Sequence, residues 1–279
     1  MAVDLHTHSS ISDGTDAPGD LVAKAAAAGL TAIALTDHDT LAGIDEARRA
    51  AGEHDITMIP GTELSVEWPT GTMHLLVYFV EPGSGPLQDR LAELRDGRTV
   101  RNRKIVTRLN ELGLDFTLDD VAAVAAGESV GRPHIADVMV ERGYVRSRRE
   151  AFDRYLATGR PAYFDRLRLH AETAIRLAAE TGALTSIAHP YTIGIGRDDY
   201  REAFTTLAAT GLTGIEAFHS EHDPDLRTHL ANLAEDLGLV ATGGSDYHGT
   251  GKEGVALGVG RGDLDVADEV LVQLNASRR

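Results

Sequence analysis

Short apolar runs that end in histidine or a carboxylate are the feature that most limits how this chain can fold. Each run has the length of a buried strand, and helical patterns separate most of the runs. In a parallel sheet wound into a barrel, the carboxyl ends of the strands meet at one mouth. The polar residues at these ends should therefore gather at one place. They are His6, His8, Asp13, His38, Glu63, His74, His189, Asp246 and His248.

The alternation of strand and helix predicts an α/β architecture with a mostly parallel sheet, most simply a barrel. One connection is too short for a helix, because the turn signal at residues 68–71 directly joins Thr57–Val66 to Met73–Val80. These two strands should form an antiparallel hairpin, which would bring His74 close to Glu63. The other strands are expected at Val3–Leu5, Thr31–Leu35, Leu184–Ala188, Gly214–Phe218, Leu239–Thr242 and Val255–Val259, and early helices at Pro18–Ala28 and Leu41–Gly52.

The alternation stops between Gly83 and about Leu167, where the pattern is helical throughout. Two segments, beginning at Thr117 and Ser147, have a hydroxyl followed three residues later by an acid, which is typical of a helix start. We therefore expect a barrel formed by residues 1–83 and 168–279, with an inserted helical subdomain at 84–167. Residues 89–170 hold 16 Lys/Arg against 13 Asp/Glu, whereas the rest of the chain is strongly acidic. The segment is either a solvated helical surface or a surface that faces an anionic substrate.

Composition restricts the ligands and partners. The chain has no cysteine, so any metal must be held by His, Asp or Glu. The net charge of −16 makes the protein a poor candidate for binding long nucleic acid. No apolar run approaches the roughly 18 residues that span a membrane, and no signal peptide is visible, so a cytoplasmic location is expected. The oligomeric state is not predicted.

The spacing of the histidines strengthens the metal interpretation. Alternate residues of an extended backbone point the same way, so the pairs His6/His8 and Asp246/His248 can each reach one ion. A lone histidine is more often a core or surface residue, but six of the twelve histidines occupy strand ends here. The four that lack such a setting are expected at the surface: His54, His170, His222 and His229.

Two further segments are candidates for contacting a substrate. Gly131-Arg132-Pro133-His134 opens a predicted helix, where Pro133 suits the first turn and the helix N-terminus favours an anion. Arg132 adds a guanidinium fork suited to phosphate. His219 ends another predicted strand and is a candidate for phosphate contact or for proton donation. A plain helix start and a supporting role for His219 are the alternatives.

The ordered motifs resemble the PHP (polymerase and histidinol phosphatase) family. They are Asp4-Leu-His-Thr-His8 with Ser12-Asp-Gly-Thr15, Thr36-Asp-His-Asp39, Gly61-Thr-Glu63, Ala188-His-Pro190 and Gly244-Ser-Asp-Tyr-His-Gly249, and they span nearly the whole chain. The resemblance implies a distorted seven-stranded (β/α) barrel of TIM-like form, and a metal-dependent phosphoesterase that hydrolyses phosphate monoesters.

The resemblance also implies the ligands of two to three divalent ions, which could be Mn, Fe or Zn. His6, His8, Glu63 and Asp246 would hold one ion and a bridging water as nucleophile. Glu63 would be shared with a second ion, and Asp13 would belong to a third. The helical insertion and Arg132-Pro-His134 resemble the branch that acts on nucleoside 3′,5′-bisphosphates and, in some members, the 5′ ends of short RNA. Arg132, His134 and His219 would then contact a small phosphorylated substrate.

Other functions remain open at this point. A histidinol-phosphate phosphatase would share the metals, but the positive charge of the Arg-rich insertion would repel its cationic substrate. A catalytically inactive metal- or nucleotide-binding scaffold is a different class of protein. An amidohydrolase would need a lysine between its metals, and all three lysines are expected away from strand ends: Lys24, Lys104 and Lys252.

Overall fold

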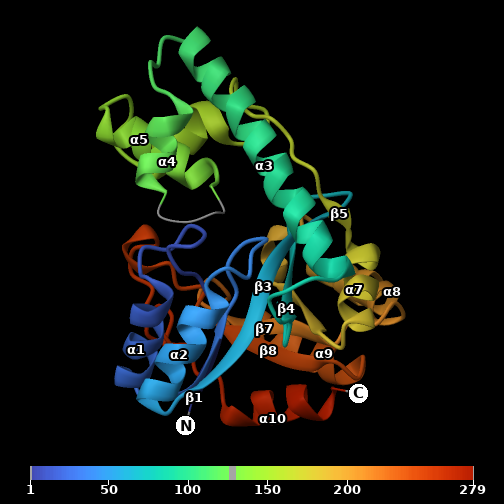
Figure 1. Ribbon diagram of the computed structural model, residues 1–279. Coiled ribbons are helices and arrows are strands. Elements are labelled where there is room, and N and C mark those ends of the chain that lie inside the picture. Colours follow the sequence, from blue (N-terminus) through green and yellow to red (C-terminus); the bar gives the residue numbers. More distant parts are fainter. Residues whose placement is uncertain (1, 126–129, 279) are drawn as a thin grey trace.

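The computed structural model describes residues 2–125 and 130–278, and its central feature is a nearly closed barrel (Figure 1). The sheet closes where the segment after the last barrel strand returns to the first: the Asp246 N–H donates to the His6 carbonyl, and the His8 N–H to the Tyr247 carbonyl, both at 2.9 Å. The predicted seven-stranded barrel is confirmed. In order around it lie β1 (Ala2–Thr7), β2 (Leu30–Leu35), β3 (Thr57–Glu67), β4 (Met73–Tyr78), β6 (Leu184–Ala188), β7 (Gly214–His219) and β8 (Val240–Gly244).

One strand runs against the rest. β4 is antiparallel to both β3 and β6, whereas the other neighbouring barrel strands are parallel. The predicted hairpin is therefore confirmed, with Gly61 opposite Tyr78 and Val66 opposite Met73. Because β4 is reversed, its first residues lie at the same mouth as the last residues of its neighbours. This reversal allows His74, the second residue of β4, to reach the strand-end cluster.

Amphipathic helices cover the outside of the barrel. In α2 the buried residues Ile44, Ala47 and Ala51 recur at helical spacing, and Arg48 and Arg49 face outward. A second apolar cluster fills the end of the barrel away from the mouth, where α10 covers it. Within the described residues, no helix is both long and apolar enough to cross a membrane. The covering helices are α1 (Pro18–Ala27), α2 (Ile44–His54), α7 (Ala171–Glu180), α8 (Tyr200–Ala208), α9 (Pro224–Asp236) and α10 (Asp268–Ala276).

The helical segment between β4 and α7 has its own apolar core. Figure 1 shows α3 (Pro86–Glu111) leaving the barrel, with α4 (Leu118–Val124) and α5 (Arg132–Glu141) around its far end. Ile105, Leu109 and Ile135 belong to a buried cluster separate from those of the barrel. Short helical turns at 148–156 complete it. The expected helical range includes residues 126–129, which lie outside the described residues.

The helical segment confirms one prediction, at its Thr117 helix start, and differs from another, at its C-terminal end. The Thr117 hydroxyl accepts a hydrogen bond from the Asp120 N–H at 3.2 Å, and the Asp120 carboxylate accepts one from the Thr117 N–H at 2.7 Å, so the predicted capping box is present. The expectation of helix throughout was wrong at its end. Residues 157–168 contain turns and extended chain that lead back to β5 (Leu169–His170), a two-residue strand paired with β3.

The predicted strand at Val255–Val259 was also wrong. Val255 and Leu257 are buried, but Val259 is exposed, and the segment is a tight loop with a bridge between Ala256 and Gly260. Gly258 and Gly260 have positive φ angles of 71° and 55°, which an extended strand cannot accommodate. The loop folds over β1, where the Gly258 N–H donates to the Asp4 carboxylate at 2.8 Å. The apolar sequence pattern alone did not distinguish this loop from a strand.

Candidate metal centre

Two histidines of the first strand form the centre of the site. His6 lies in β1 and His8 just after it, so both rings point into the mouth of the barrel, where both are fully buried. Their Nε2 atoms are 3.1 Å apart. The Asp246 Oδ1 atom lies 3.4 Å from each nitrogen, and the Glu63 Oε2 atom lies 3.3 and 3.1 Å from them. Four potential ligand atoms thus converge on one point.

Glu63 connects this point to the rest of the cluster. Its Oε1 atom faces His74 Nδ1 at 2.6 Å and His189 Nε2 at 2.9 Å, while its Oε2 atom also faces His38 Nδ1 at 3.1 Å. The prediction that Glu63 ends its strand was wrong. β3 continues four residues further to Glu67, because it leaves β2 and pairs with β4. The carboxylate nevertheless projects into the mouth with one oxygen toward each set of histidines.

A third group lies on the outer side of His8. The Asp13 carboxylate is 3.3 Å from His248 Nε2, 3.7 Å from His38 Nε2 and 3.9 Å from His8 Nδ1. One ligand atom from each of these four residues fits within 4.8 Å of the others. All nine candidate ligands predicted from the sequence therefore lie in one continuous cluster.

The donor set fits divalent first-row metal ions. It consists of imidazole nitrogens and carboxylate oxygens, which suit Mn, Fe or Zn. Hydrogen bonds within the protein do not satisfy every ring nitrogen of the cluster. Within the described residues, His38 Nδ1 is buried without a hydrogen-bond partner. The Glu216 carboxylate holds the Nδ1 proton of a neutral His6 ring, so that the lone pair of His6 Nε2 points toward His8 Nε2, 3.1 Å away. Cations between these atoms would satisfy both arrangements.

The ionisation of the cluster favours a cation. Burial raises the pKa of Glu63, but the surrounding histidines outweigh it and hold that pKa well below its usual value. Burial lowers the pKa of His6, but the carboxylates of Glu216, Asp246 and Glu63 outweigh it and raise the pKa well above its usual value. For His8 the same competition between burial and carboxylates raises the pKa to about 10. The carboxylates are thus ionised at neutral pH, and a bound metal would displace protons from the histidines.

Glu216 supports the cluster and was missed from the sequence. It lies in β7 and is fully buried. One carboxylate oxygen is 2.9 Å from His6 Nδ1, and the other accepts a hydrogen bond from the His189 N–H at 2.6 Å. A carboxylate behind a ligand histidine fixes the ring orientation and tautomer. A glutamate inside an otherwise apolar strand was the available signal, since buried carboxylates are rare unless paired.

His219 and Lys252 both approach Asp246 from outside the nine. The His219 Nδ1 atom accepts from the Glu221 N–H at 3.0 Å, which leaves the proton on Nε2, 3.4 Å from Asp246 Oδ2. Lys252 Nζ lies 2.6 Å from the same oxygen. The expectation that Lys252 lies away from the site was wrong, because the turn after His248 folds the chain back. Lys252 contacts one carboxylate from the side, whereas Glu63 is the group shared within the cluster.

His222 was also misplaced by the sequence. It is buried, not exposed, and its Nδ1 atom lies 2.9 Å from the Ala217 carbonyl oxygen. The chain turns sharply after β7, with the His222 N–H donating to the His219 carbonyl at 3.1 Å, and this turn places the His222 ring behind His219. Burial lowers its pKa to about 4, so the ring is neutral at pH 7. His54, His170 and His229 are exposed as expected.

The Arg132-Pro-His134 segment begins α5 but does not present a free arginine. The Arg132 guanidinium donates to the Leu156 carbonyl at 3.0 Å and lies 5.6 and 5.5 Å from the ring centres of Phe152 and Tyr163. His134 is buried, and its Nδ1 atom accepts from the Gly131 N–H at 3.0 Å. Both side chains are therefore fixed in position by the insertion.

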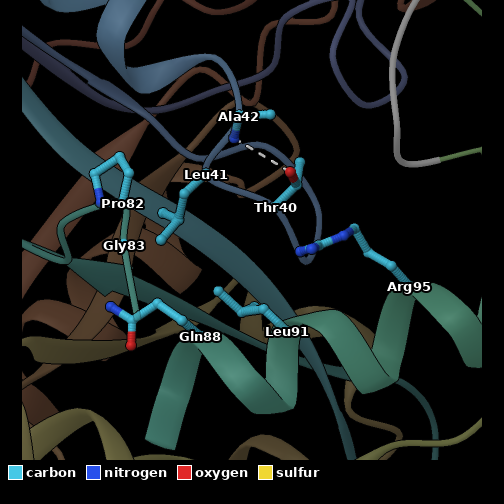
Figure 2. Close-up of a pocket in the computed structure, with 8 residues that line it drawn as sticks. All are labelled: Thr40, Leu41, Ala42, Pro82, Gly83, Gln88, Leu91 and Arg95. Atoms are coloured by element: carbon cyan, nitrogen blue, oxygen red, sulfur yellow. Dashed lines mark hydrogen bonds between the residues drawn. The ribbon is translucent and has the colours of Figure 1, made fainter. Parts of the chain in front are cut away.

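A pocket beside the cluster contains none of the nine residues. It lies between the first half of α3, the turn at 82–83 and the loop Thr40–Ala42 (Figure 2). Leu91 and Arg95 project toward that loop, and the Arg95 Nη1 group donates to the Asp39 carbonyl at 3.3 Å. No histidine or carboxylate lines the pocket. It is part of the contact between the insertion and the loop that carries His38.

Comparisons with known proteins show the family to which the chain belongs. A 3′,5′-nucleoside bisphosphate phosphatase of Chromobacterium violaceum is 33% identical over 92% of this chain and 90% of its own length. A 5′-3′ exoribonuclease of Haemophilus influenzae is 34% identical over 88% of this chain and 89% of its own length. A solved structure from Bifidobacterium adolescentis, described as a metal-dependent phosphoesterase, superposes with a TM-score of 0.87 at 30% identity, covering 99% of this chain and 96% of that one. The PHP domain model matches residues 4–235. The chain belongs to the PHP domain family.

Proposed function

We propose that this protein hydrolyses a phosphate monoester of nucleoside 3′,5′-bisphosphates with the help of two to three divalent metal ions. The broader class is established: the chain is a metal-dependent phosphoesterase of the PHP family, a hydrolase acting on phosphoester bonds. The observation that carries the proposal is Glu63, whose two oxygens face two different sets of histidines. A carboxylate in that position suits an ion on each side.

The proposed ligands fall into three sets around this carboxylate. Metals bound there would lower the pKa of water and neutralise charge on the phosphoryl oxygens. The metals are expected to be Mn, Fe or Zn. The first set is His6, His8, Glu63 and Asp246, the second is Glu63, His74 and His189, and the third is Asp13, His38 and His248.

The remaining polar groups of the mouth orient the His6 ring, supply a proton to the leaving group and add positive charge. Glu216 holds the Nδ1 proton of His6, so that His6 Nε2 presents its lone pair to the cluster. His219 carries a proton on Nε2 beside Asp246, and it is the candidate donor to the leaving alkoxide. Lys252, next to the same carboxylate, adds positive charge where a phosphate would lie. No serine or cysteine nucleophile is needed in this arrangement.

The substrate class rests on similarity and on charge. The Chromobacterium relative is named for 3′,5′-nucleoside bisphosphates. A second phosphate needs its own cationic site, and the helical segment over the mouth is the positively charged part of an acidic chain. The same charge disfavours histidinol phosphate, which carries a cationic amine. An inactive scaffold has no use for a carboxylate shared between two histidine sets. The Haemophilus relative supports a second candidate substrate, the 5′-phosphorylated end of short RNA.

The direct test of the metal role is Glu63→Gln. The amide keeps the shape of the side chain but loses the charge that both sides of the cluster share. Phosphate release from adenosine 3′,5′-bisphosphate should fall by more than about a hundredfold, since loss of even an outer-layer partner costs tenfold to a hundredfold. Bound metal, counted by elemental analysis, should fall as well. Glu67→Gln is the matched control, because Glu67 lies on the same strand and is exposed. Full metal content and activity in Glu63→Gln would contradict the proposal.

A further inference from the structure

Three arginines are buried together at the seam between the insertion and the barrel. Arg98 and Arg101 lie three residues apart on one face of α3, and Arg166 comes from the extended chain that leaves the insertion. Arg98 and Arg101 are only 7% and 5% exposed. The side chain of Arg166 is 11% exposed. Arginine is seldom buried without a partner that balances its charge.

A single carboxylate serves this cluster. The Asp39 Oδ2 atom accepts from Arg98 Nε at 2.8 Å and from Arg166 Nη1 at 3.2 Å. Arg101 donates only to the neutral amide oxygen of Asn102, at 2.9 and 3.3 Å, and it forms no ion pair among the described residues. Among residues 2–125 and 130–278, three positive charges thus face one negative charge in a buried place.

The surplus positive charge is costly in a buried place. Burial, followed by repulsion from Arg166, Arg98 and Arg132, lowers the pKa of Arg101 to about 8. Burial and Arg98 likewise lower the pKa of Arg166 to about 9, although Asp39 opposes them. A guanidinium keeps its proton in proteins. The unfavourable charge is therefore relieved by an anion and not by loss of a proton.

The arginines also lie next to the metal centre. Asp39 directly follows His38, one of the nine cluster residues. The Asp39 carboxylate accepts from both Arg98 and Arg166, so these guanidinium groups lie beside the residue that follows His38. An anion held by the arginines would therefore lie beside the cluster, on its His38 side.

We propose that Arg98, Arg101 and Arg166 bind the second phosphate of the substrate, the one that is not hydrolysed. This inference rests on the proposed bisphosphatase function. Planar guanidinium forks suit the oxygens of a phosphate dianion, which would balance the two surplus charges. The sequence assigned this role to Arg132 and His134. In the structure Arg132 is held between aromatic rings behind the cluster, where it adds positive charge.

The kinetic test compares two substrates in the metal-loaded enzyme. Arg101→Gln should raise KM for adenosine 3′,5′-bisphosphate about tenfold or more, because a hydrogen bond to a charged group contributes at least that much. It should leave kcat/KM for p-nitrophenyl phosphate unchanged, since that substrate has only the scissile phosphate. Arg103→Gln is the matched control, because Arg103 is exposed on the same helix. Equal losses on both substrates, or no loss on either, would overturn the assignment.

A binding test separates this inference from the proposed function. Calorimetric titration of metal-free protein with inorganic phosphate should show a site that Arg101→Gln or Arg166→Gln weakens about tenfold or more and Arg103→Gln leaves intact. Phosphate should also raise the melting temperature of the wild type more than that of Arg101→Gln. If the protein hydrolyses no bisphosphate yet binds phosphate in this way, the function fails and the anion site stands. Phosphate binding that is the same in all variants refutes the anion site, whatever the activity.

Discussion

At the scale of single residues, the site depends on carboxylates that are fully buried among histidines. Glu63 faces the histidines directly, and Glu216 lies one layer behind, with one oxygen on the His6 ring and the other on the backbone of His189. His189 has a φ angle of 28°, an unfavourable backbone conformation for a residue with a side chain. Glu216 therefore stabilises both a ring orientation and a strained backbone.

Replacing Glu216 should weaken metal binding without removing a proposed ligand. Glu216→Gln retains the size of the side chain, but it no longer fixes the His6 tautomer. We expect metal affinity to fall about tenfold to a hundredfold, as measured by competition with a chromogenic chelator. Glu235→Gln, at an exposed site on α9, should have no effect. Unchanged affinity in Glu216→Gln would show that His6 does not depend on this partner.

Asp39 should make the stability of the protein sensitive to acid. Burial raises the pKa of Asp39, but Arg98 and Arg166 outweigh it and lower the pKa to about 2, below the usual 3.8. The ionised form therefore stabilises the fold above pH 4, and this contribution is lost as the pH falls toward 2. The shift corresponds to about 2 kcal/mol of unfolding free energy.

Asp39→Asn should accordingly lower the unfolding free energy by at least about 2 kcal/mol at pH 7. The difference from the wild type should shrink as the pH falls from 4 toward 2. Urea denaturation across this range measures both effects. Asp45→Asn removes the partner of an exposed ion pair and should change stability by less than about 1 kcal/mol. An Asp39→Asn deficit that did not change with pH would contradict this account.

The sequence revealed the nine candidate ligands because strand ends share one physical location in a barrel. It could not reveal residues whose position depends on how a loop folds. Lys252 reaches Asp246, and His222 packs behind His219, only because the turns after β8 and β7 reverse the chain. The arginine cluster was equally hidden, since Arg98 and Arg166 are far apart in sequence and meet only through Asp39.

At the scale of elements, local signals predicted helices and turns well and loops poorly. The capping box at Thr117 and the hairpin between β3 and β4 follow from hydrogen bonds within a few residues, and both are present. The segment 255–259 has the apolar sequence pattern of a strand, but Gly258 and the following Gly260 adopt positive φ angles and the segment forms a loop. Only contacts with β1, distant in sequence, specify that shape.

The separate core of the insertion predicts that it can be weakened on its own. Ile135 is fully buried in that core. Ile135→Ala should cost about 2–5 kcal/mol locally. Limited proteolysis should then cleave within 84–167 faster, while metal affinity stays near the wild-type value. Ile175 lies on the buried face of α7, in the core of the barrel. Ile175→Ala is the comparison, and it should lower both the resistance to proteolysis and the metal affinity. Loss of metal binding in Ile135→Ala would show that the barrel and the insertion form one cooperative unit.

At the scale of the whole molecule, charge is divided between the parts. The chain is strongly acidic, yet the insertion that lies over the mouth carries excess Lys and Arg, and its buried arginines lie beside the metal cluster. Such a distribution draws a small, highly charged anion to the mouth while the rest of the surface repels long polyanions. Under the proposed function, metal ions held by the cluster would account for phosphoester hydrolysis, and the arginines would account for a preference for a second phosphate.

The most direct test of this account is kcat/KM of the metal-loaded protein for four substrates: adenosine 3′,5′-bisphosphate, AMP, histidinol phosphate and a 5′-phosphorylated dinucleotide. The account predicts the highest value for the bisphosphate, at least about tenfold above AMP, since the second phosphate adds charged hydrogen bonds. It predicts the lowest value for histidinol phosphate. A preference for histidinol phosphate, equal values for the bisphosphate and AMP, or no phosphate release from any of the four would contradict it.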